Sequence, residues 1–352
     1  MKVLNARDKE IKLPAFFPDA TSGVVRGVDS RDLEKANVDG IVVNTYHILR
    51  KDMVETIKRF GGIHRYMNLN MPIISDSGGF QVMSLIHNNN LLGKIEKNSI
   101  TFKLDGEKHT LTPEKCIGIQ LKLNSDIIMC LDDCTKPDLD KENQQESVER
   151  TISWAEKCKD EFERLTKNNN ERPLLFSIIQ GGNNKGLRKH CAKELLKIGF
   201  DGYSFGGWPI QDGKLMFNIL EYTSRLIPDK YPKYAMGLGK PNDMVACSRI
   251  GYGIFDCVLP TRDARHERLY VFTKEPNKKN IAQKNFYEHM YIRKSHKSDN
   301  SPVSEFCDCH LCKNYSKSYL YNLFKLNDPL AIRLATIHNL KFYSKLAELL
   351  RP

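Results

Sequence analysis

One segment turns from an apolar run into a basic one: Ile254-Phe255-Asp256-Cys257-Val258-Leu259-Pro260-Thr261-Arg262-Asp263-Ala264-Arg265. Its first five residues are typical of a short strand, Pro260 ends the run, and two arginines follow where we expect the chain to emerge into a loop. Asp256 therefore has two interpretations. It is either an acid that works beside an anionic substrate, or a buried carboxylate in a structural ion pair with Arg262 or Arg265.

This strand is the last of eight apolar runs that alternate with amphipathic stretches between residues 14 and 260. The alternation is typical of repeated βα units around a parallel sheet. The expected strands are Ala15–Pro18, Gly40–Asn44, Pro72–Ser75, Asp126–Leu131, Leu174–Ile179, Gly202–Phe205, Tyr234–Leu238 and Ile254–Val258.

The helices expected between these strands include Pro113–Leu123, Gln145–Leu165, Lys185–Ile198 and Asn242–Ile250. The first is preceded by Thr112, so that threonine and proline occupy the N-cap and N1 positions. Eight strands with crossover helices predict an α/β fold, a closed (β/α)8 TIM barrel. An open doubly wound sheet is the alternative, but it would more typically carry a glycine-rich dinucleotide turn after its first strand.

The bulk composition is that of a globular protein with one large core. Hydrophobic residues make up 40% and charged residues 28% of the 352 residues, a length that fits a barrel of about 250 residues with an appendage. Lys and Arg outnumber acids by 54 to 43, for a net charge of +11. This excess is compatible with a polyanionic partner such as nucleic acid, and also with an ordinary basic protein.

Several features predict a cytoplasmic location and no membrane partner. Residues 1–10 contain no apolar core of signal-peptide length, and no later stretch approaches the length of a membrane span. Seven of the ten cysteines are scattered singly through expected strands and helices. Scattered cysteines of this kind are typical of reduced core residues rather than of a disulfide framework.

The other three cysteines are clustered and predict a metal site. Cys307, Cys309 and Cys312 are followed, 26 residues later, by His338. Three thiolates and an imidazole form the ligand set of a closed tetrahedral Zn²⁺ site, which leaves no open position for an activated water. We therefore expect one structural zinc ion per chain, with His310 as a less suitable competing ligand inside the cysteine loop.

Polar residues follow six of the expected strands, where a barrel carries its active site. Glycines among them let the backbone approach a flat ligand, and carboxylates or amides can read its edge. The segments are Asp76–Gln81, Asp132–Cys134, Gln180–Gly182, Gly206–Pro209, Gly237–Pro241 and Asp256. Asp76 and Asp256 could divide glycosidic chemistry between a nucleophile and a proton carrier, which by themselves would also suit a sugar hydrolase.

The chain resembles the tRNA-guanine transglycosylase (queuine tRNA-ribosyltransferase) family, in order from about residue 14 to 350. The resemblance rests on long motifs: Asp76-Ser77-Gly78-Gly79-Phe80-Gln81-Val82, Gln180-Gly181-Gly182, Met236-Gly237-Leu238-Gly239-Lys240-Pro241, the segment Phe255–Arg265 and the Cys3His cluster. It implies a pentosyltransferase on a zinc-bearing (β/α)8 barrel, which exchanges guanine at anticodon position 34 for a 7-deazaguanine base during tRNA queuosine modification.

The resemblance also implies roles for individual residues. Asp256 would be the nucleophile that attacks C1′ and holds the ribose covalently, and Asp76 would donate and accept the proton. The base-binding residues would be Ser77, Gly78, Gly79, Phe80, Asp132, Gln180, Gly207 and Met236. The RNA-binding residues would be Gly237, Gly239, Lys240, Thr261, Arg262 and Arg265.

The predicted organisation is a catalytic barrel over residues 1–273 and, over 274–352, a zinc-binding region with C-terminal helices that complete the barrel. Residues 274–300 are rich in Lys, Asn and His and are expected to be a polar surface excursion. Two helices follow, at Tyr315–Lys325 and Pro329–Leu350. The resemblance further implies a homodimer that binds the tRNA anticodon loop.

Two departures from the family pattern leave the substrate open. Trp208-Pro209-Ile210 stands where the bacterial enzymes have small or aliphatic residues, so the choice among preQ1, preQ0 and queuine is undecided. Asp132-Asp133 replaces an Asp-Glu pair, a small change if Asp133 is structural. Two other functions stay in view: a paralogue that inserts a 7-deazaguanine into DNA, and a catalytically silent partner subunit that binds tRNA.

Overall fold

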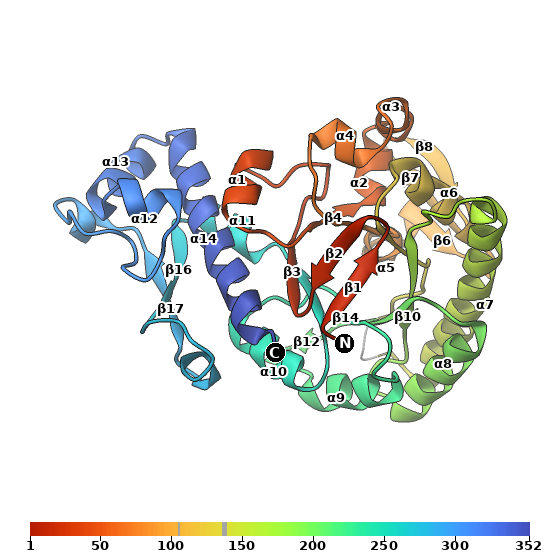
Figure 1. The fold of residues 1–352 in the computed structure, drawn as a ribbon. Coiled ribbons are helices and arrows are strands. Elements are labelled where there is room, and N and C mark those ends of the chain that lie inside the picture. Colours follow the sequence, from red (N-terminus) through yellow and green to blue (C-terminus); the bar gives the residue numbers. More distant parts are fainter. Residues whose placement is uncertain (105, 136–138) are drawn as a thin grey trace.

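The computed structural model describes residues 1–104, 106–135 and 139–352. Its centre is an eight-stranded parallel sheet in the order β3-β15-β14-β11-β10-β9-β5-β4 (Figure 1). Each strand overlaps one of the eight predicted runs, so the prediction is confirmed. The bounds are β3 Ala15–Pro18, β4 Ile41–Asn44, β5 Ile73–Asp76, β9 Ile127–Met129, β10 Leu174–Ile179, β11 Gly202–Phe205, β14 Lys233–Ala235 and β15 Ile254–Cys257.

The two edges of this sheet meet, which distinguishes a barrel from an open sheet. Beyond the end of β3, Asp19 forms a parallel bridge with Val42 of β4, and the Ala20 N–H donates to the Val42 carbonyl at 2.7 Å. The predicted (β/α)8 barrel is therefore confirmed over the doubly wound alternative. Closure places the carboxyl ends of all eight strands around one mouth.

The barrel interior is a packed apolar core. Phe17, Ile74, Met129 and Phe176 are buried inside it and belong to one hydrophobic cluster. The same cluster includes Leu4 and Ile11 of an N-terminal hairpin, in which β1 (Val3–Ala6) pairs antiparallel with β2 (Lys9–Lys12). This hairpin covers the amino ends of the strands and leaves the carboxyl ends open.

Helices surround the barrel (Figure 1). The predicted helices are confirmed within a few residues at their ends, and Thr112 caps α6 by accepting the Lys115 N–H at 3.2 Å. The bounds are α1 Ser30–Lys35, α2 Thr45–Arg50, α3 Val54–Arg59, α4 Ile63–Met67, α5 Gly79–Asn88, α6 Pro113–Leu123, α7 Lys141–Thr166, α8 Lys185–Ile198, α9 Phe217–Leu226 and α10 Pro241–Arg249.

The segment after β15 differs from the sequence prediction. Residues expected to form a loop form helix α11, Leu259–Arg265, with Pro260 in its first turn. Proline is tolerated there because the first N–H groups of a helix have no partner inside the helix. The strand therefore ends at Cys257, before Pro260, and Pro260 lies in the first turn of a helix that carries Arg262 and Arg265.

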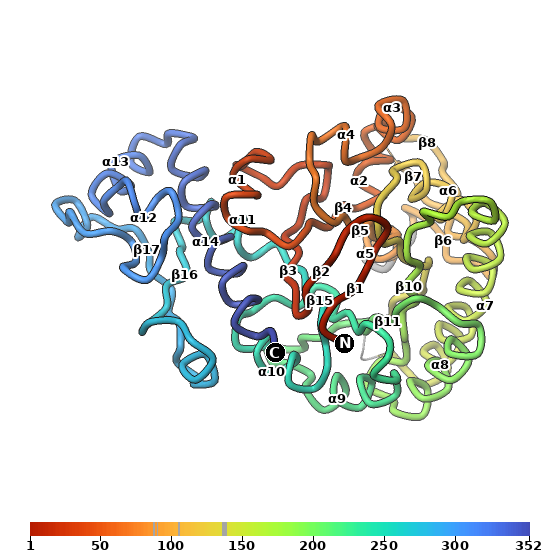
Figure 2. The backbone as a smooth tube through the Cα atoms, viewed as in Figure 1, coloured from red at the N-terminus to blue at the C-terminus, as the bar shows by residue number. Residues whose placement is uncertain are grey.

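The C-terminal part lies beside the barrel (Figure 2). Strand β16 (Arg268–Phe272) pairs antiparallel with β17 (Tyr287–Tyr291), so part of the expected polar excursion forms a strand. The pair spans the position of the predicted domain boundary at residue 273, which stays a prediction. The helices here are α12 His310–Asn314, α13 Lys317–Lys325 and α14 Pro329–Leu350.

Helix α14 joins this part to the barrel. The Tyr343 ring packs on Phe16 of β3 at a centroid distance of 4.4 Å, and Phe342 stacks on Phe272 of β16 at 4.2 Å. The smaller strands are β6 Gly93–Ile95, β7 Ile100–Leu104, β8 Glu107–Leu111, β12 Ile210–Gln211 and β13 Lys214–Leu215. Within the described residues, each helix is too short or too polar to cross a bilayer.

Gly202 tests how tightly the barrel is packed. A Cβ atom at Gly202 would lie 2.4 Å from the ring of Phe176, its partner on β10, which is fully buried. We expect Gly202→Ala to lower the free energy of unfolding by about 1–3 kcal/mol, measured by urea denaturation, because the core cannot absorb the methyl group. Gly118→Ala is the control: among the described residues its Cβ would meet nothing within 4 Å. Equal stability of the two variants would contradict a close-packed interior.

Candidate active site

A cavity of about 380 Å³ opens at the carboxyl ends of the barrel strands. It brings together seven of the residues predicted from the sequence, although they come from distant parts of the chain. They are Asp76, Phe80, Asp132, Gly207, Met236, Gly237 and Asp256. The cavity is also lined by Gln81 and Cys134, which belong to the predicted strand-end segments, and by Tyr234, which had no role in the sequence prediction.

Asp256 lies in β15 with two donors on one carboxylate oxygen. The Tyr234 hydroxyl donates to Oδ1 at 2.8 Å, and the Gly237 N–H donates to the same atom at 2.6 Å. Gly237 has a φ of +68°, a backbone conformation that favours glycine. Within the described part of the chain, Asp256 has no ion pair with Arg262 or Arg265, so the structural ion-pair interpretation is wrong.

Burial raises the pKa of Asp256 from 3.8 to about 7. The hydrogen bonds from Gly237 and Tyr234 oppose this rise, whereas the negative charges of Asp76 and Asp19 add to it. The side chain is thus poised near neutrality, with its ionised form favoured above about pH 7.

Asp76 ends β5 and is surrounded by donors. The Asn44 side chain donates to Oδ2 at 2.8 Å, and the N–H groups of Ser77 and Gly78 also bond the carboxylate. Burial is the larger effect and raises the pKa of Asp76 to about 6. Two carboxyls with pKa values near neutrality can exchange protons with a substrate at little energetic cost.

The glycine turn after Asp76 supports that carboxylate and does not line the cavity. Ser77 is buried and its Oγ accepts the Gly79 N–H at 3.2 Å, at the start of α5. A Cβ atom at Gly78 would lie 2.7 Å from the backbone nitrogen of Tyr46. Of the predicted base-binding residues, Ser77 and Gly78 thus bond Asp76 through their N–H groups, and Gly79 begins α5.

Asp132 lines the cavity, and Gln180, which does not line it, lies behind Asp132. The Gln180 Nε2 donates to Asp132 Oδ2 at 2.6 Å, and both residues are buried. Burial raises the pKa of Asp132 to about 7, and nearby Asp76 and Asp133 raise it further against the bond from Gln180. Asp133 itself is structural, because it accepts a hydrogen bond from Arg150 and its N–H donates to Thr151 at 3.0 Å.

Two aromatic rings meet at the cavity. Phe80, at the start of α5, lies edge-to-face with Trp208 at a centroid distance of 5.6 Å. Both side chains are partly exposed, and Pro209 and Ile210 line the same side. Met236 is half-buried after β14. Trp208 therefore reaches the cavity, as its place after a strand had suggested.

Sequence reasoning missed Asn44 and Tyr234, and it placed Gln81 at the barrel mouth without assigning it a partner. Asn44 bonds the carboxylate of Asp76, Tyr234 bonds that of Asp256, and the Gln81 side chain also donates to Asp76. Asn44 is the last residue of a predicted strand, so its position was a usable signal. Tyr234 lies inside an apolar run, and only the register of β14 against β15 reveals its contact with Asp256.

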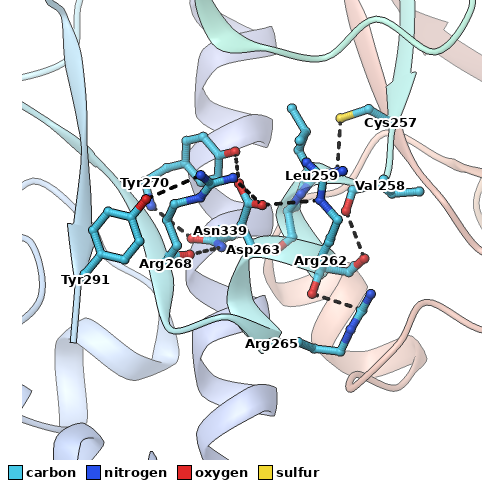
Figure 3. Close-up of polar contacts among 12 residues, drawn as sticks. Cys257, Val258, Leu259, Arg262, Asp263, Arg265, Arg268, Tyr270, Tyr291 and Asn339 are labelled. Carbon is cyan, nitrogen blue, oxygen red and sulfur yellow. Dashed lines mark hydrogen bonds and ion pairs between the residues drawn. The ribbon is translucent and has the colours of Figure 1, made fainter. Parts of the chain in front are cut away.

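The predicted RNA-binding residues lie in the loop between β14 and α10, which holds Gly237, Gly239 and Lys240, and on α11, which holds Thr261, Arg262 and Arg265. Arg262 is half-exposed, and Arg265 donates to the Thr261 carbonyl at 3.0 Å (Figure 3). Thr261 is buried, with its hydroxyl donating to the Val258 carbonyl at 3.2 Å. Lys240 is exposed at the start of α10.

Helix α11 is held in position by polar side chains of β16 and α14 (Figure 3). Asp263 pairs with Arg268 at 2.6 Å and accepts a hydrogen bond from the Tyr270 hydroxyl. Asn339 of α14 donates to the Pro260 carbonyl at 3.0 Å. Gly239 is a packing position, since a Cβ there would overlap the Cys257 sulfur at 2.1 Å.

The Cys3His cluster is assembled as predicted. The ligand atoms of Cys307, Cys309, Cys312 and His338 all lie within 4.8 Å of one another. The His338 Nε2 lies 2.8 Å from the Tyr270 carbonyl, so the proton on Nε2 leaves Nδ1 free to face the thiols. His310 lies outside the cluster, with its Nδ1 3.1 Å from the Asn314 side chain. The cluster could hold a tetrahedral metal ion.

The whole chain is similar to one protein family. Residues 1–352 match the family model described as queuine tRNA-ribosyltransferase. A queuine tRNA-ribosyltransferase of Psychrobacter sp. strain PRwf-1 is 40% identical over 345 residues, 97% of this chain and 86% of that protein. Proteins of the same name from Shewanella sediminis and Thermoanaerobacter sp. strain X514 are each 41% identical, over 97% of this chain and 86% of their own length.

Asp132 is expected to reduce stability above neutral pH. Its folded-state pKa is raised to about 7, so between about pH 4 and 7 the unfolded chain loses this proton while the folded chain keeps it, and stability falls. Asp132→Asn keeps an acceptor for Gln180 but carries no charge. We expect the variant to gain on the order of 1–4 kcal/mol at pH 8 and nothing at pH 4, by urea denaturation.

The control is Asp160→Asn, which replaces an exposed acid on α7. It should leave the free energy of unfolding unchanged at both pH values. A gain for Asp132→Asn that is as large at pH 4 as at pH 8 would contradict an origin in the buried charge.

Proposed function

Because the chain belongs to the queuine tRNA-ribosyltransferase family and is therefore a tRNA-guanine transglycosylase, we propose that it exchanges guanine at anticodon position 34 for a 7-deazaguanine base. The exchange proceeds through a covalent aspartyl-ribosyl intermediate. The observation that carries the proposal is the meeting of Asp76, Asp132 and Asp256 in one cavity, each with its pKa raised to between about 6 and 7. Two carboxyls would do the chemistry and the third would read the base.

Asp256 is the proposed nucleophile. Its Oδ1 accepts both hydrogen bonds, from Tyr234 and Gly237, which leaves Oδ2 as the oxygen that attacks C1′. The bond between C1′ and the guanine nitrogen breaks as the bond between C1′ and Oδ2 forms. The ribose is then held on the enzyme as an ester while the RNA backbone stays intact.

Asp76 is the proposed proton carrier. It protonates guanine as this base leaves, and the resulting carboxylate then takes the proton from the ring nitrogen of the incoming base. That nitrogen attacks C1′ and releases Asp256, so two displacements retain the configuration at C1′. Water must be kept out while the ester exists, and the rings of Phe80 and Trp208 provide apolar cover at the cavity.

Base recognition follows from complementary donors and acceptors. The edge of guanine presents an N1–H and a 2-amino group, which suit the Asp132 carboxylate, and a 6-oxo oxygen, which suits the Gly207 N–H and the Gln180 amide. Phe80 and Met236 would stack on the faces of the base. Ser77 and Gly78 contribute by bonding Asp76, and Gly79 by starting α5. The position-7 substituent, that of preQ1, preQ0 or queuine, would lie toward Trp208 and Pro209.

The RNA would bind across the open end of the barrel. Lys240, Arg262 and Arg265 are cations that can contact phosphates flanking the target nucleotide. Gly237, Gly239 and Thr261 shape the backbone of this surface. The target base has to leave any stack to enter the cavity, which suits an unpaired anticodon loop.

The Cys3His cluster fits one structural Zn²⁺ per chain. Cys307, Cys309, Cys312 and His338 would supply all four ligands, so no position is open for substrate. The ion would fasten the cysteine loop to α14, which packs on the barrel. The proposal also includes a catalytic unit of residues 1–273 and a zinc-binding unit of residues 274–352. The protein would form a homodimer and act in the cytoplasm.

The decisive experiment follows the release of radiolabelled guanine from position 34 of unmodified tRNA in the presence of preQ1, preQ0 or queuine. We expect release from tRNA with at least one base and none from duplex DNA. Asp256→Asn should reduce release by at least ~10³-fold, because the amide cannot form the ester. Asp160→Asn is the matched control and should be fully active.

The other outcomes separate the alternatives. Release from DNA alone would select the DNA-modifying paralogue. Silence on both nucleic acids would favour a partner subunit, and unchanged release by Asp256→Asn would remove this residue as the nucleophile.

Metal content tests the zinc proposal. We expect one zinc per chain by atomic absorption, and Cys309→Ser should lose the metal and expose α12 and the start of α14 to hydrogen exchange, because metal binding and local folding are coupled. The matched variant His310→Ala should keep the metal, since His310 lies outside the cluster. Full zinc binding by Cys309→Ser would show that the ligand set is wrong.

A further inference from the structure

Arg188 is a buried cation beside the cavity. It lies on α8, is 1% exposed, and its guanidinium plane packs on the Phe205 ring at 4.1 Å from the centroid. Among the described residues, no carboxylate forms an ion pair with it. Its three nitrogens instead donate to backbone carbonyls: Nε to Gly182 at 2.8 Å, Nη1 to Ile179 at 2.8 Å and Nη2 to Gly206 at 2.9 Å.

A buried charge without an acid is costly, so its contacts need an explanation. Burial lowers the pKa of Arg188 to about 10, which still leaves the side chain protonated at neutral pH. An apolar residue could fill the same volume without this cost. Unlike an apolar side chain, the planar guanidinium can donate hydrogen bonds to three carbonyls at once in a fixed geometry.

The three carbonyls belong to the two loops that carry the base-reading groups. Ile179 and Gly182 flank Gln180, whose amide donates to Asp132. The Gly206 carbonyl belongs to the same peptide unit as the Gly207 N–H. Because the peptide is planar and trans, fixing this carbonyl toward Arg188 directs the N–H the opposite way.

The direction of that N–H leads into the cavity. In the free protein burial raises the pKa of Cys134, which lines the cavity, and the Gly207 N–H opposes this rise, so that N–H is directed toward the Cys134 sulfur. A thiol is a weak acceptor, so a carbonyl oxygen of a bound base would be a better partner. The Gly207 N–H thus faces the place where the base would bind, and without a base it has only the weakly accepting thiol of Cys134 beside it.

We propose that Arg188 is a positioning residue that aims the Gly207 N–H and the Gln180 amide at the 6-oxo oxygen of the base. This inference rests on the proposed function for the identity of the base. Arg188 does not touch the base, and it acts by fixing the two loops that do.

The test compares two bases that differ at this one position. Guanine has an oxygen at position 6, and 6-thioguanine keeps the N1–H and the 2-amino group but has a sulfur there, a weaker acceptor. Binding of radiolabelled guanine and its displacement by 6-thioguanine would be measured by equilibrium dialysis for wild type, Arg188→Met and Arg188→Lys. For each protein, the result is the dissociation constant of 6-thioguanine divided by that of guanine.

We expect wild type to prefer guanine by about tenfold, the value of one good hydrogen bond. Arg188→Met should reduce this preference to about twofold or less, mainly by weakening guanine. Arg188→Lys should fall between, because an ammonium group cannot reach all three carbonyls. Because both dissociation constants are measured on the same variant, a fraction of unfolded protein changes them equally and leaves their ratio unchanged.

The matched control is Arg172→Met. Arg172 lies at the amino ends of β10 and β11, whereas Arg188 contacts the backbone at their carboxyl ends. Arg172 pairs with Asp201 at 2.8 and 2.9 Å, before β10 and β11 begin. It should lose stability but keep the preference for guanine. A merely structural role for Arg188 predicts the same result for Arg188→Met, and that result would overturn the proposal.

The remaining outcomes are also decisive. A wild-type protein that binds guanine and 6-thioguanine equally, or neither base, would overturn the assignment. Intact discrimination in binding with no exchange on tRNA would instead count against the proposed function and leave the role of Arg188 standing.

Discussion

Closure of the parallel barrel is the constraint on which the rest of the structure depends. The bridge between Asp19 and Val42 joins the two edges of the sheet and forces eight strand ends to converge on one mouth. Side chains that follow different strands, such as Asp76 and Asp256, therefore share one cavity and one dielectric environment. Removing them from water raises their pKa values, and each negative charge makes the next harder to form.

The fold offsets this accumulation of carboxylates with hydrogen bonds rather than with ion pairs. Tyr234 and Gly237 bond Asp256, Asn44 bonds Asp76, and Gln180 bonds Asp132. Neutral donors stabilise an ionised carboxylate without locking it in that state, so the proton remains exchangeable. The buried cation Arg188 donates to backbone carbonyls and so fixes the shape of the loops around the cavity instead of neutralising a carboxylate.

The C-terminal part connects the metal-binding cluster to the mouth of the barrel through α14. His338 bonds the Tyr270 carbonyl, and the next residue, Asn339, donates to the carbonyls of Pro260 in α11 and Arg268 in β16. The Tyr270 hydroxyl reaches Asp263 on α11 (Figure 3). A shift of the cluster would thus be transmitted to the helix that carries Arg262 and Arg265.

The sequence by itself determined the eight strands, most of the helices around them, the Cys3His cluster and the strand ends from which Asp76 and Asp256 reach the cavity. These features follow from local patterns: apolar periodicity, cysteine spacing and acids at the ends of strands. Only the tertiary structure decided the contacts that cross between strands. Tyr234 looks like a core residue until the register of β14 and β15 brings its hydroxyl to Asp256, Pro260 looks like a terminator until α11 begins there, and Arg188 looks like a helix surface cation until two loops cover it. Such roles depend on which distant backbone groups a side chain meets, and chain closure sets those encounters.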